Sequence, residues 1–214
     1  MQARSYLEIG VERGLNFLQI RVPLKLAVDP HFEIPGGIQD GPGMRFFELT
    51  SDEFFANPPS VLTDEGCDVV FVDGLHSHAQ ALRDVENSLR YLSPKGVILV
   101  HDCLPASEIE ASPSFEQASA TPGFDGNWTG DVYKTIVRLR ASRPDLFVCV
   151  LDVDHGVGLI TTGKPENRLT LGDAAIEALN FADLKRSAKE LLNLKPLSWF
   201  QSWLRGRTVV GREV

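Results

Sequence analysis

Seven short apolar runs, rich in β-branched and aromatic residues, recur along the 214-residue chain and constrain its fold more than any other feature. Most are continuous in apolar character rather than alternating, which is typical of strands covered on both faces. Helical patterns lie between several of them, notably at 79–92 and 131–144. This alternation predicts an α/β fold with a Rossmann-like, doubly wound, mainly parallel sheet. The predicted strands are 6–9, 24–28, 45–49, 68–72, 97–100, 146–151 and 157–161.

The last two runs are connected differently from the others. Only Asp154, His155 and Gly156 separate their apolar parts, which is the spacing of a hairpin. The final two strands are therefore expected to be antiparallel, in a sheet whose other strands are parallel.

Composition narrows the class of protein. The chain has 21 Lys and Arg against 29 Asp and Glu, a net charge of −8, so it lacks the positive field of a general nucleic-acid binder. No apolar run approaches the roughly 20 residues that span a bilayer, and the N-terminus has no signal-peptide pattern. The three cysteines are far apart and odd in number, which argues against a disulfide framework and favours a reducing, cytoplasmic location.

The stretch YLEIGVERG places Glu8 and Gly10 at the end of the first predicted strand. Gly10 permits a tight turn and a close approach of the backbone to a ligand. Gly14 is expected to begin a helix whose free N–H groups face the same ligand. The pattern differs from the G-x-G-x-x-G of dinucleotide enzymes, and an ordinary strand-to-helix turn explains it about as well.

Two further strand ends carry polar groups. Asp29 in LAVDP follows Gly10 by 19 residues, at the place where nucleotide-binding folds hold ribose hydroxyls. An aspartate in a turn before proline is the alternative explanation. Ser51 or Asp52, after the third strand, is expected to cap a short helix, and this role is compatible with a ligand contact by Asp52.

The strands that end in FVDGLHSH and LVHDC give the most specific pattern. If they are adjacent and parallel, Asp73 and Asp102 meet at one sheet edge, where two carboxylates repel unless a cation or a shared proton intervenes. Such oxygen ligands suit Mg²⁺ or Ca²⁺, and His101 is a third candidate ligand if the strand breaks there. His76 is placed to act as a general base, whereas His78 is expected on the surface.

Segments outside the alternation are expected to surround a ligand or to extend the domain. The loops 31–43 and 105–128 follow strand ends and are long for a compact domain. Asp131 is expected to cap the helix that follows the second loop, with Trp128 as a pocket wall. Beyond Pro165, helical patterns at 172–194 and 197–204 are expected to pack on the domain itself or on a second subunit.

Six stretches, in this order and spacing, resemble the class I S-adenosylmethionine-dependent methyltransferases from about residue 6 to residue 162. The closer similarity is to metal-dependent sugar O-methyltransferases of the macrolide-tailoring type. The stretches are YLEIGVERG, VDP, SDEFFA, FVDGLHSHAQALRDVENSL, SPKGVILVHDCLP and WTGDVYKTIVRLRASRPDL.

The resemblance implies a seven-stranded sheet with one antiparallel strand and a site at its strand ends. It implies a divalent cation such as Mg²⁺ on Asp73, His101 and Asp102, with catalytic roles for His76 as base and for Asp73. Relatives carry an acid where this chain has His101, so His101 decides whether the site holds a metal. The residues implied to contact S-adenosylmethionine are Glu8, Gly10, Gly14, Asp29, Ser51, Asp52 and Asp73.

The sequence therefore predicts a methyltransferase domain at 1–165 and a C-terminal helical extension at 166–214. The predicted reaction is methyl transfer to a hydroxyl of a sugar-like or other small-molecule acceptor, recognised by 36–43 and 105–128. Because the first strand begins near the N-terminus, the tail or a partner subunit is expected to cover the sheet, and a homo-oligomer is predicted. The alternatives are an inactive cofactor- or partner-binding protein on this fold and, ranked last, an oxidoreductase.

Overall fold

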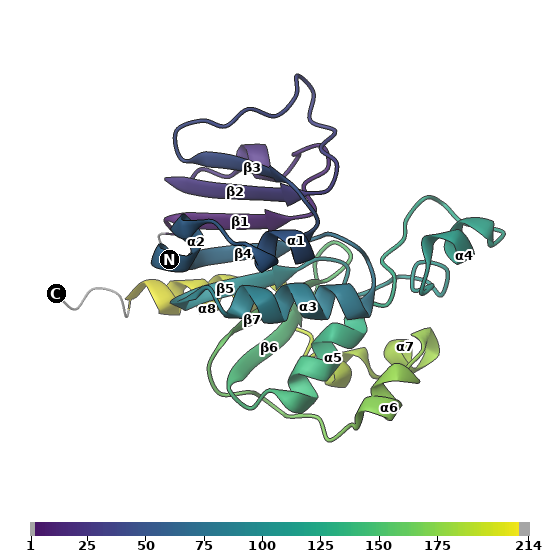
Figure 1. Ribbon diagram of the computed structural model, residues 1–214. Helices are drawn as coiled ribbons and strands as arrows, with labels where there is room; N and C mark the ends of the chain where they lie inside the picture. The colour runs from purple at the N-terminus through teal and green to yellow at the C-terminus, as the bar shows by residue number, and fades with distance from the viewer. Residues whose placement is uncertain (1–2, 210–214) are drawn as a thin grey trace.

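A computed structural model describes residues 3–209 of the chain, which form one mixed sheet with helices on both faces (Figure 1). The strand order is β3-β2-β1-β4-β5-β7-β6, and β7 alone runs antiparallel to its two neighbours. The predicted α/β fold with one antiparallel strand is therefore confirmed. The strands are β1 (Ser5–Ile9), β2 (Leu24–Asp29), β3 (Met44–Glu48), β4 (Cys67–Val72), β5 (Leu92–Val100), β6 (Leu146–Leu151) and β7 (Val157–Thr162).

One face of the sheet is covered by most of the helices. Alternate residues of the central strands, such as Ile9, Val72 and Ile98, point into this layer and form the main core with residues of the helices. Helix α3 repeats its apolar residues at helical spacing, which fixes the face that it presents to the sheet. The helices of this layer are α1 (Ser51–Ala56), α2 (Ser60–Glu65), α3 (His78–Leu89) and α5 (Tyr133–Ser142).

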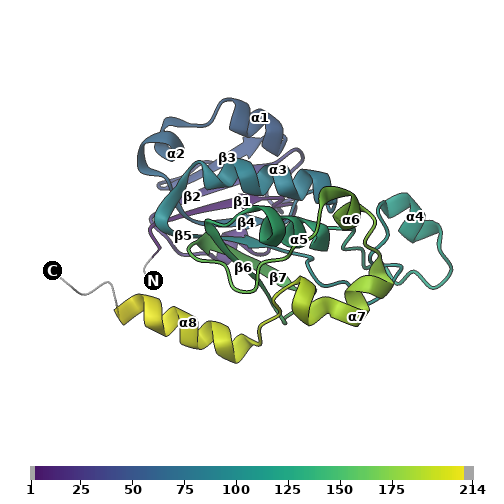
Figure 2. The ribbon, with the colours of Figure 1, turned by 90° about the horizontal axis from the view of Figure 1, so that it is seen from below.

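The opposite face is covered in part by the last helix, α8 (Leu197–Val209), which Figure 2 shows across the sheet from α3. Trp199, Phe200 and Trp203 of α8 pack against apolar residues of β5, β6 and β7. The Trp199 ring stacks on Phe147 of β6, with 5.7 Å between ring centroids. The second helical pattern of the tail thus packs on its own sheet.

The segment after β1 is not the helix predicted to begin at Gly14. Only a three-residue 3₁₀ helix forms there, η1 (Phe17–Gln19). Glu12 and Gly14 have φ values of 45° and 71°, which no right-handed helix accommodates. The carbonyls of Phe17 and Ile20 are satisfied instead by the ammonium group of Lys25, at 2.8 and 3.2 Å. The loop is held by the Phe17 ring, which is fully buried.

Two other boundaries differ from the prediction. Residues 93–96, which lie between the predicted helix and the predicted strand, belong to β5, because β5 begins at Leu92 and pairs with β4 across a bulge between Cys67 and Val69. The pattern at 172–194 contains two helices, α6 (Asp173–Glu177) and α7 (Phe181–Leu191). A capping box between Asn180 and Asp183 begins α7 and so separates the two.

The tail shares the core of the sheet domain. Ile176, Leu184 and Leu191 belong to the main core cluster. The guanidinium group of Arg140, only 3% exposed, donates to the carbonyls of Glu190, Leu191, Glu166 and Asn167. The predicted division at residue 165 stays a prediction, and residues 210–214 of the extension lie outside the described residues. Within 3–209, no helix is long and apolar enough to cross a membrane.

We expect Arg140→Met to lower the free energy of unfolding by about 3 kcal/mol, because four backbone carbonyls lose a buried donor. Arg143→Met is the matched control, since Arg143 lies just beyond the same helix and forms an exposed pair with Asp145 at 2.6 Å. The control is expected to change stability by less than about 1 kcal/mol. Urea unfolding of both variants tests the difference, and equal effects would show that the buried hydrogen bonds of Arg140 contribute no more to stability than an exposed ion pair.

Candidate active site

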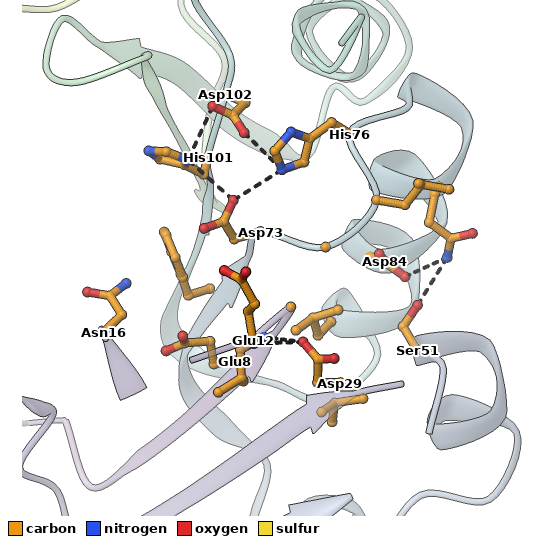
Figure 3. Close-up of a pocket in the computed structure, with 18 of the residues that line it drawn as sticks. Glu8, Glu12, Asn16, Asp29, Ser51, Asp73, His76, Asp84, His101 and Asp102 are labelled. Carbon is orange, nitrogen blue, oxygen red and sulfur yellow. Dashed lines mark hydrogen bonds and ion pairs between the residues drawn. The ribbon is translucent and has the colours of Figure 1, made fainter. Parts of the chain in front are cut away.

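A cleft of about 1270 Å³ opens at the carboxyl ends of β1, β2, β4 and β5, where open α/β sheets bind their ligands (Figure 3). All the predicted site residues except Gly14 line it. Carboxylates dominate its wall, and Arg13 is the one Arg or Lys among the described lining residues. The acidic lining residues are Glu8, Glu12, Asp29, Asp52, Asp73, Asp84, Asp102 and Asp154.

Gly10 brings the end of β1 against the end of β4. Its φ is 82°, and a Cβ atom there would lie 2.1 Å from the carbonyl oxygen of Asp73. Only glycine fits this conformation and this approach, so the predicted tight turn is present. Gly14, at φ 71°, closes the next turn by donating from its N–H to the Val11 carbonyl at 2.7 Å.

Glu8 is a buried carboxyl on the floor of the cleft. It accepts a hydrogen bond from the Tyr6 hydroxyl and is 2% exposed. Burial raises the pKa of Glu8 to about 7, against the lowering effect of the Tyr6 hydrogen bond. Protonated and ionised forms of this carboxyl are therefore both accessible near neutral pH.

Asp29 organises the turn after β1. One carboxylate oxygen accepts from the N–H groups of Val11 and Glu12 at 2.7 and 2.8 Å, and the other accepts from the His31 N–H at 2.8 Å. Both explanations offered by the sequence are thus compatible, because Asp29 forms a turn before Pro30 and also lines the cleft.

The cap of α1 differs from the prediction. Thr50, not Ser51 or Asp52, is the N-cap residue, in a capping box with Glu53. Ser51 and Asp52 are consequently released for other contacts. Both lie within hydrogen-bond distance of the Gln80 side-chain amide, at 3.0 and 3.3 Å.

Asp73, His76 and Asp102 converge on one point, as their adjacent parallel strands predict. One ligand atom from each lies within 4.8 Å of the others. The chain breaks out of β5 because Asp102 adopts φ 61°, and this lets His101 and Asp102 face Asp73 together. Two carboxylates and an imidazole form a donor set that suits a divalent cation.

His76 is held by the loop that precedes α5. Its Nδ1–H donates to the Trp128 carbonyl at 2.7 Å, so Nε2 faces Asp102 at 3.1 Å and Asp73 at 3.6 Å. The Trp128 ring stacks on the imidazole at 5.3 Å. Burial opposes protonation, but the hydrogen bond to Asp73 and the charge of Asp102 outweigh it and raise the pKa of His76.

His101 bridges three carboxylates. Its Nδ1 lies 3.2 Å from Asp73 and 3.3 Å from Asp102, and its Nε2 lies 3.0 Å from Asp154. Burial works against the charged form, yet hydrogen bonds to Asp102 and Asp73 raise the pKa of His101 to about 11. Its imidazolium therefore contacts both Asp73 and Asp102, the two carboxylates that would bind a metal ion.

Several residues differ from their predicted places. His78 is buried rather than exposed, with Nδ1 3.1 Å from the Thr135 hydroxyl. Asp131 does not cap α5 but accepts from the His78 N–H at 2.7 Å, a free N–H group in the first turn of α3, whose N-cap residue is Ser77. Asp154 was not predicted, although the polar turn between β6 and β7 was a signal for it.

Only one of the two long loops reaches the cleft. Residues 126–129 line it, whereas residues 36–43 are absent from its described lining. The lining of the cleft gives no support for ligand recognition by 36–43, which stays a prediction. That loop follows β2 but turns back to pair at Gly41 with Met44, beside β3.

We expect His101→Asn to remove a stabilisation that depends on pH. The folded-state pKa of about 11 exceeds the ordinary value of 6.5, so the stabilisation is complete below pH 6.5 and decreases as pH rises toward 11. The difference in unfolding free energy between wild type and variant should thus shrink from about pH 6 to about pH 10. Urea unfolding in EDTA measures it, with the exposed His31→Asn as control. A difference that grows with pH would contradict the bridging role.

The chain is similar in sequence and in fold to known methyltransferases. Residues 7–103 match a family model described as a methyltransferase domain. The comparison with curated proteins found no match. Among solved structures, the chain is similar to the SAH-bound methyltransferase PaMTH1 of Podospora anserina, with TM-score 0.51 and 18% identity, over 76% of this chain and 73% of that one.

Two more solved structures are similar. A Staphylococcus aureus protein provisionally described as a caffeoyl-CoA O-methyltransferase has TM-score 0.53 and 16% identity, over 75% of this chain and 77% of that one. Cofactor-bound Rv0187 from MTB has TM-score 0.51 and 14% identity, over 75% of this chain and 73% of that one. These likenesses establish the fold, and the domain match spans every residue from Glu8 to Asp102 in the predicted site. The chain therefore has the fold of the class I S-adenosylmethionine-dependent methyltransferases, and its residues 7–103 match a methyltransferase domain.

Proposed function

We propose that this methyltransferase transfers the methyl group of S-adenosylmethionine to a hydroxyl of a sugar-like or other small-molecule acceptor, with His76 as the base. The observation that carries the proposal is the position of His76. Its Nε2 faces Asp73 and Asp102 at the strand ends, and its Nδ1 is committed to the Trp128 carbonyl. The nitrogen that faces the cleft is thus the one able to accept a proton.

The cleft suits the methyl donor in charge and in shape. S-adenosylmethionine supplies an electrophilic methyl group on a positively charged sulfonium, and an acidic cleft favours such a ligand. Gly10 lets the ends of β1 and β4 approach each other at the floor of the cleft, and Asp29 holds the next turn. We assign the methionine part of the cofactor to Glu8 and Gly10, its ribose to Asp29, and its adenine to Ser51 and Asp52.

The acceptor belongs at the rim formed by Trp128 and its neighbours. Asn127, Trp128 and His155 line the cleft around the Asp73–His76–Asp102 cluster. An aromatic ring with amide and imidazole groups beside it suits a small polyhydroxylated molecule. A hydroxyl held against His76 Nε2 would lose its proton to that nitrogen as the methyl group transfers, and proximity supplies much of the rate.

The structure supports a bound divalent cation less well than it supports His76 as the base. Asp73 and Asp102 fit such an ion, and when bound it would lower the pKa of an acceptor hydroxyl. His101 lies within 3.3 Å of both carboxylates and carries the compensating charge itself. We propose that His101 weakens the binding of a cation. When no cation is bound, its imidazolium balances the charges of Asp73 and Asp102.

We expect His76→Gln to lower kcat by roughly a hundredfold or more, the usual contribution of a general base, while binding of S-adenosylmethionine is retained. Wild-type activity should rise with pH through the pKa of His76, which lies above its ordinary value of 6.5, and the variant should lose this rise. Transfer of a labelled methyl group to a panel of sugar and catechol hydroxyls measures both effects.

His31→Gln is the matched control, because His31 is exposed and outside the cleft. Retention of full activity by His76→Gln would remove His76 as base. Tight binding of S-adenosylmethionine without transfer to any acceptor would favour the alternative, a cofactor-binding protein that has lost activity. The predicted homo-oligomer and cytoplasmic location stay predictions.

We expect His101→Asn to bind Mn²⁺ at least about tenfold more tightly than the wild type, because a positive charge next to the ligands is removed. Asp73→Asn in the same background should abolish the gain, since it removes one of the two carboxylates. Calorimetric titration of Mn²⁺ into the three proteins tests this. Equal Mn²⁺ affinity of wild type and His101→Asn would show that His101 does not compete with a cation.

A further inference from the structure

Asp154 lines the cleft but takes no part in the proton transfer described above. It lies in the turn between β6 and β7, and its side chain is 63% exposed. We propose that Asp154 binds an ammonium group of the acceptor, so that the acceptor is a polyhydroxylated amine, such as an amino sugar, rather than a neutral or an anionic sugar. This inference rests on the proposed function, because the amine would belong to the molecule whose hydroxyl is methylated.

The turn that carries Asp154 is fixed to the segment after β5. The Cys103 N–H donates to the Gly156 carbonyl at 2.9 Å. The Leu104 N–H donates to the His155 carbonyl at 2.7 Å. Asp154 itself has φ 53°, a conformation that aspartate and asparagine adopt more readily than most residues. These bonds keep the Asp154 carboxylate in one place relative to the catalytic cluster.

The Asp154 carboxylate is only partly engaged by its neighbours. Its Oδ2 lies 3.0 Å from His101 Nε2, and the backbone N–H of His155 also donates to the carboxylate. The His155 ring lies further away, with Nε2 3.9 Å from Oδ1. A carboxylate has about four acceptor positions, so Asp154 can still accept from a ligand in the cleft. An ammonium group is the donor that gains most there, because both partners are then charged.

The charge at this end of the cleft also favours a cation. Asp73, Asp102 and Asp154 are three carboxylates, and the imidazolium of His101 balances one of them. His76 must be neutral to act as the base, so an excess of two negative charges remains. The one Arg or Lys among the described lining residues belongs to the loop after β1, where it pairs with two glutamates. An ammonium group reduces the excess, whereas a carboxylate or phosphate on the acceptor would add to it.

The position of His101 sets the spacing between the base and Asp154. Its ring contacts Asp73 through Nδ1 and Asp154 through Nε2. Figure 3 shows His101 and His76 on opposite sides of Asp73 and Asp102. Asp154 therefore lies beyond His101 as seen from His76. An acceptor that meets both must span the cluster, which suits an amine on the opposite side of a sugar ring from the reacting hydroxyl.

Binding of a matched set of sugars to the full chain, saturated with S-adenosylhomocysteine in EDTA, tests the proposal. The set contains methyl glucoside, the derivatives in which one of its hydroxyls is replaced by an amine, and methyl glucuronide. At least one amine should bind about tenfold more tightly than methyl glucoside, because a charged pair replaces a neutral hydrogen bond. Methyl glucuronide should bind more weakly than methyl glucoside. Ligand-observed NMR titrations measure these affinities.

Variants of Asp154 assign the preference to this side chain. Asp154→Asn should reduce the preference for the amine over methyl glucoside by roughly fivefold or more, because asparagine accepts the same turn conformation without the charge. Asp154→Gly should have the same effect, since glycine also accepts φ 53°. Asp152→Asn is the matched control, because Asp152 is exposed in the same connection and absent from the described lining of the cleft. The control should leave the preference unaltered.

The outcomes distinguish this inference from the proposed function. No binding of S-adenosylhomocysteine overturns both. If S-adenosylhomocysteine binds and no amine binds more tightly than methyl glucoside, this inference is overturned and the methyltransferase assignment stays intact. A lower melting temperature of the Asp154 variants with an unchanged ratio of affinities shows a merely structural role, and that result overturns the inference as well.

Discussion

The repulsion between Asp73 and Asp102 is the constraint on which this site depends. Adjacent parallel strands place the two carboxylates at one sheet edge, and their charge must be balanced there. The chain balances it with His101, the residue immediately before Asp102. This is possible because the left-handed conformation of Asp102 ends the alternation of the strand, so that consecutive residues face the same point. The backbone conformation of Asp102 thus also determines how the charges of the site are balanced.

Much of the fold was predictable because the strands are buried on both faces. Continuous apolar runs located all seven strands, and the short connection between β6 and β7 identified the antiparallel strand. The loop after β1 was not predictable in the same way. Its sequence has apolar residues at helical spacing, yet positive φ values at Glu12 and Gly14 and the bonds of Lys25 favour a loop. Such tertiary contacts leave no trace in a local pattern.

The site was predictable to the extent that strand ends determine it. Asp73, His76 and Asp102 meet because parallel neighbours bring their carboxyl ends together. Residues on connections were harder to place, since no periodicity links them to a strand. The Trp128 carbonyl that orients His76 comes from 52 residues further along the chain, and Asp154 lies in a hairpin turn. His78 is buried because α5 packs over it, which its own neighbours in sequence do not reveal.

Helix α5 connects two parts of the molecule that the sequence separates. At its N-terminal side is the loop with Trp128, whose carbonyl holds His76. Near its other end is Arg140, whose guanidinium holds the tail by four carbonyls. A ten-residue helix is a stiff rod of about 15 Å. The tail and the wall of the cleft are therefore attached to opposite ends of one helix, and the segment that orients the His76 imidazole belongs to the same element that anchors the C-terminal segment.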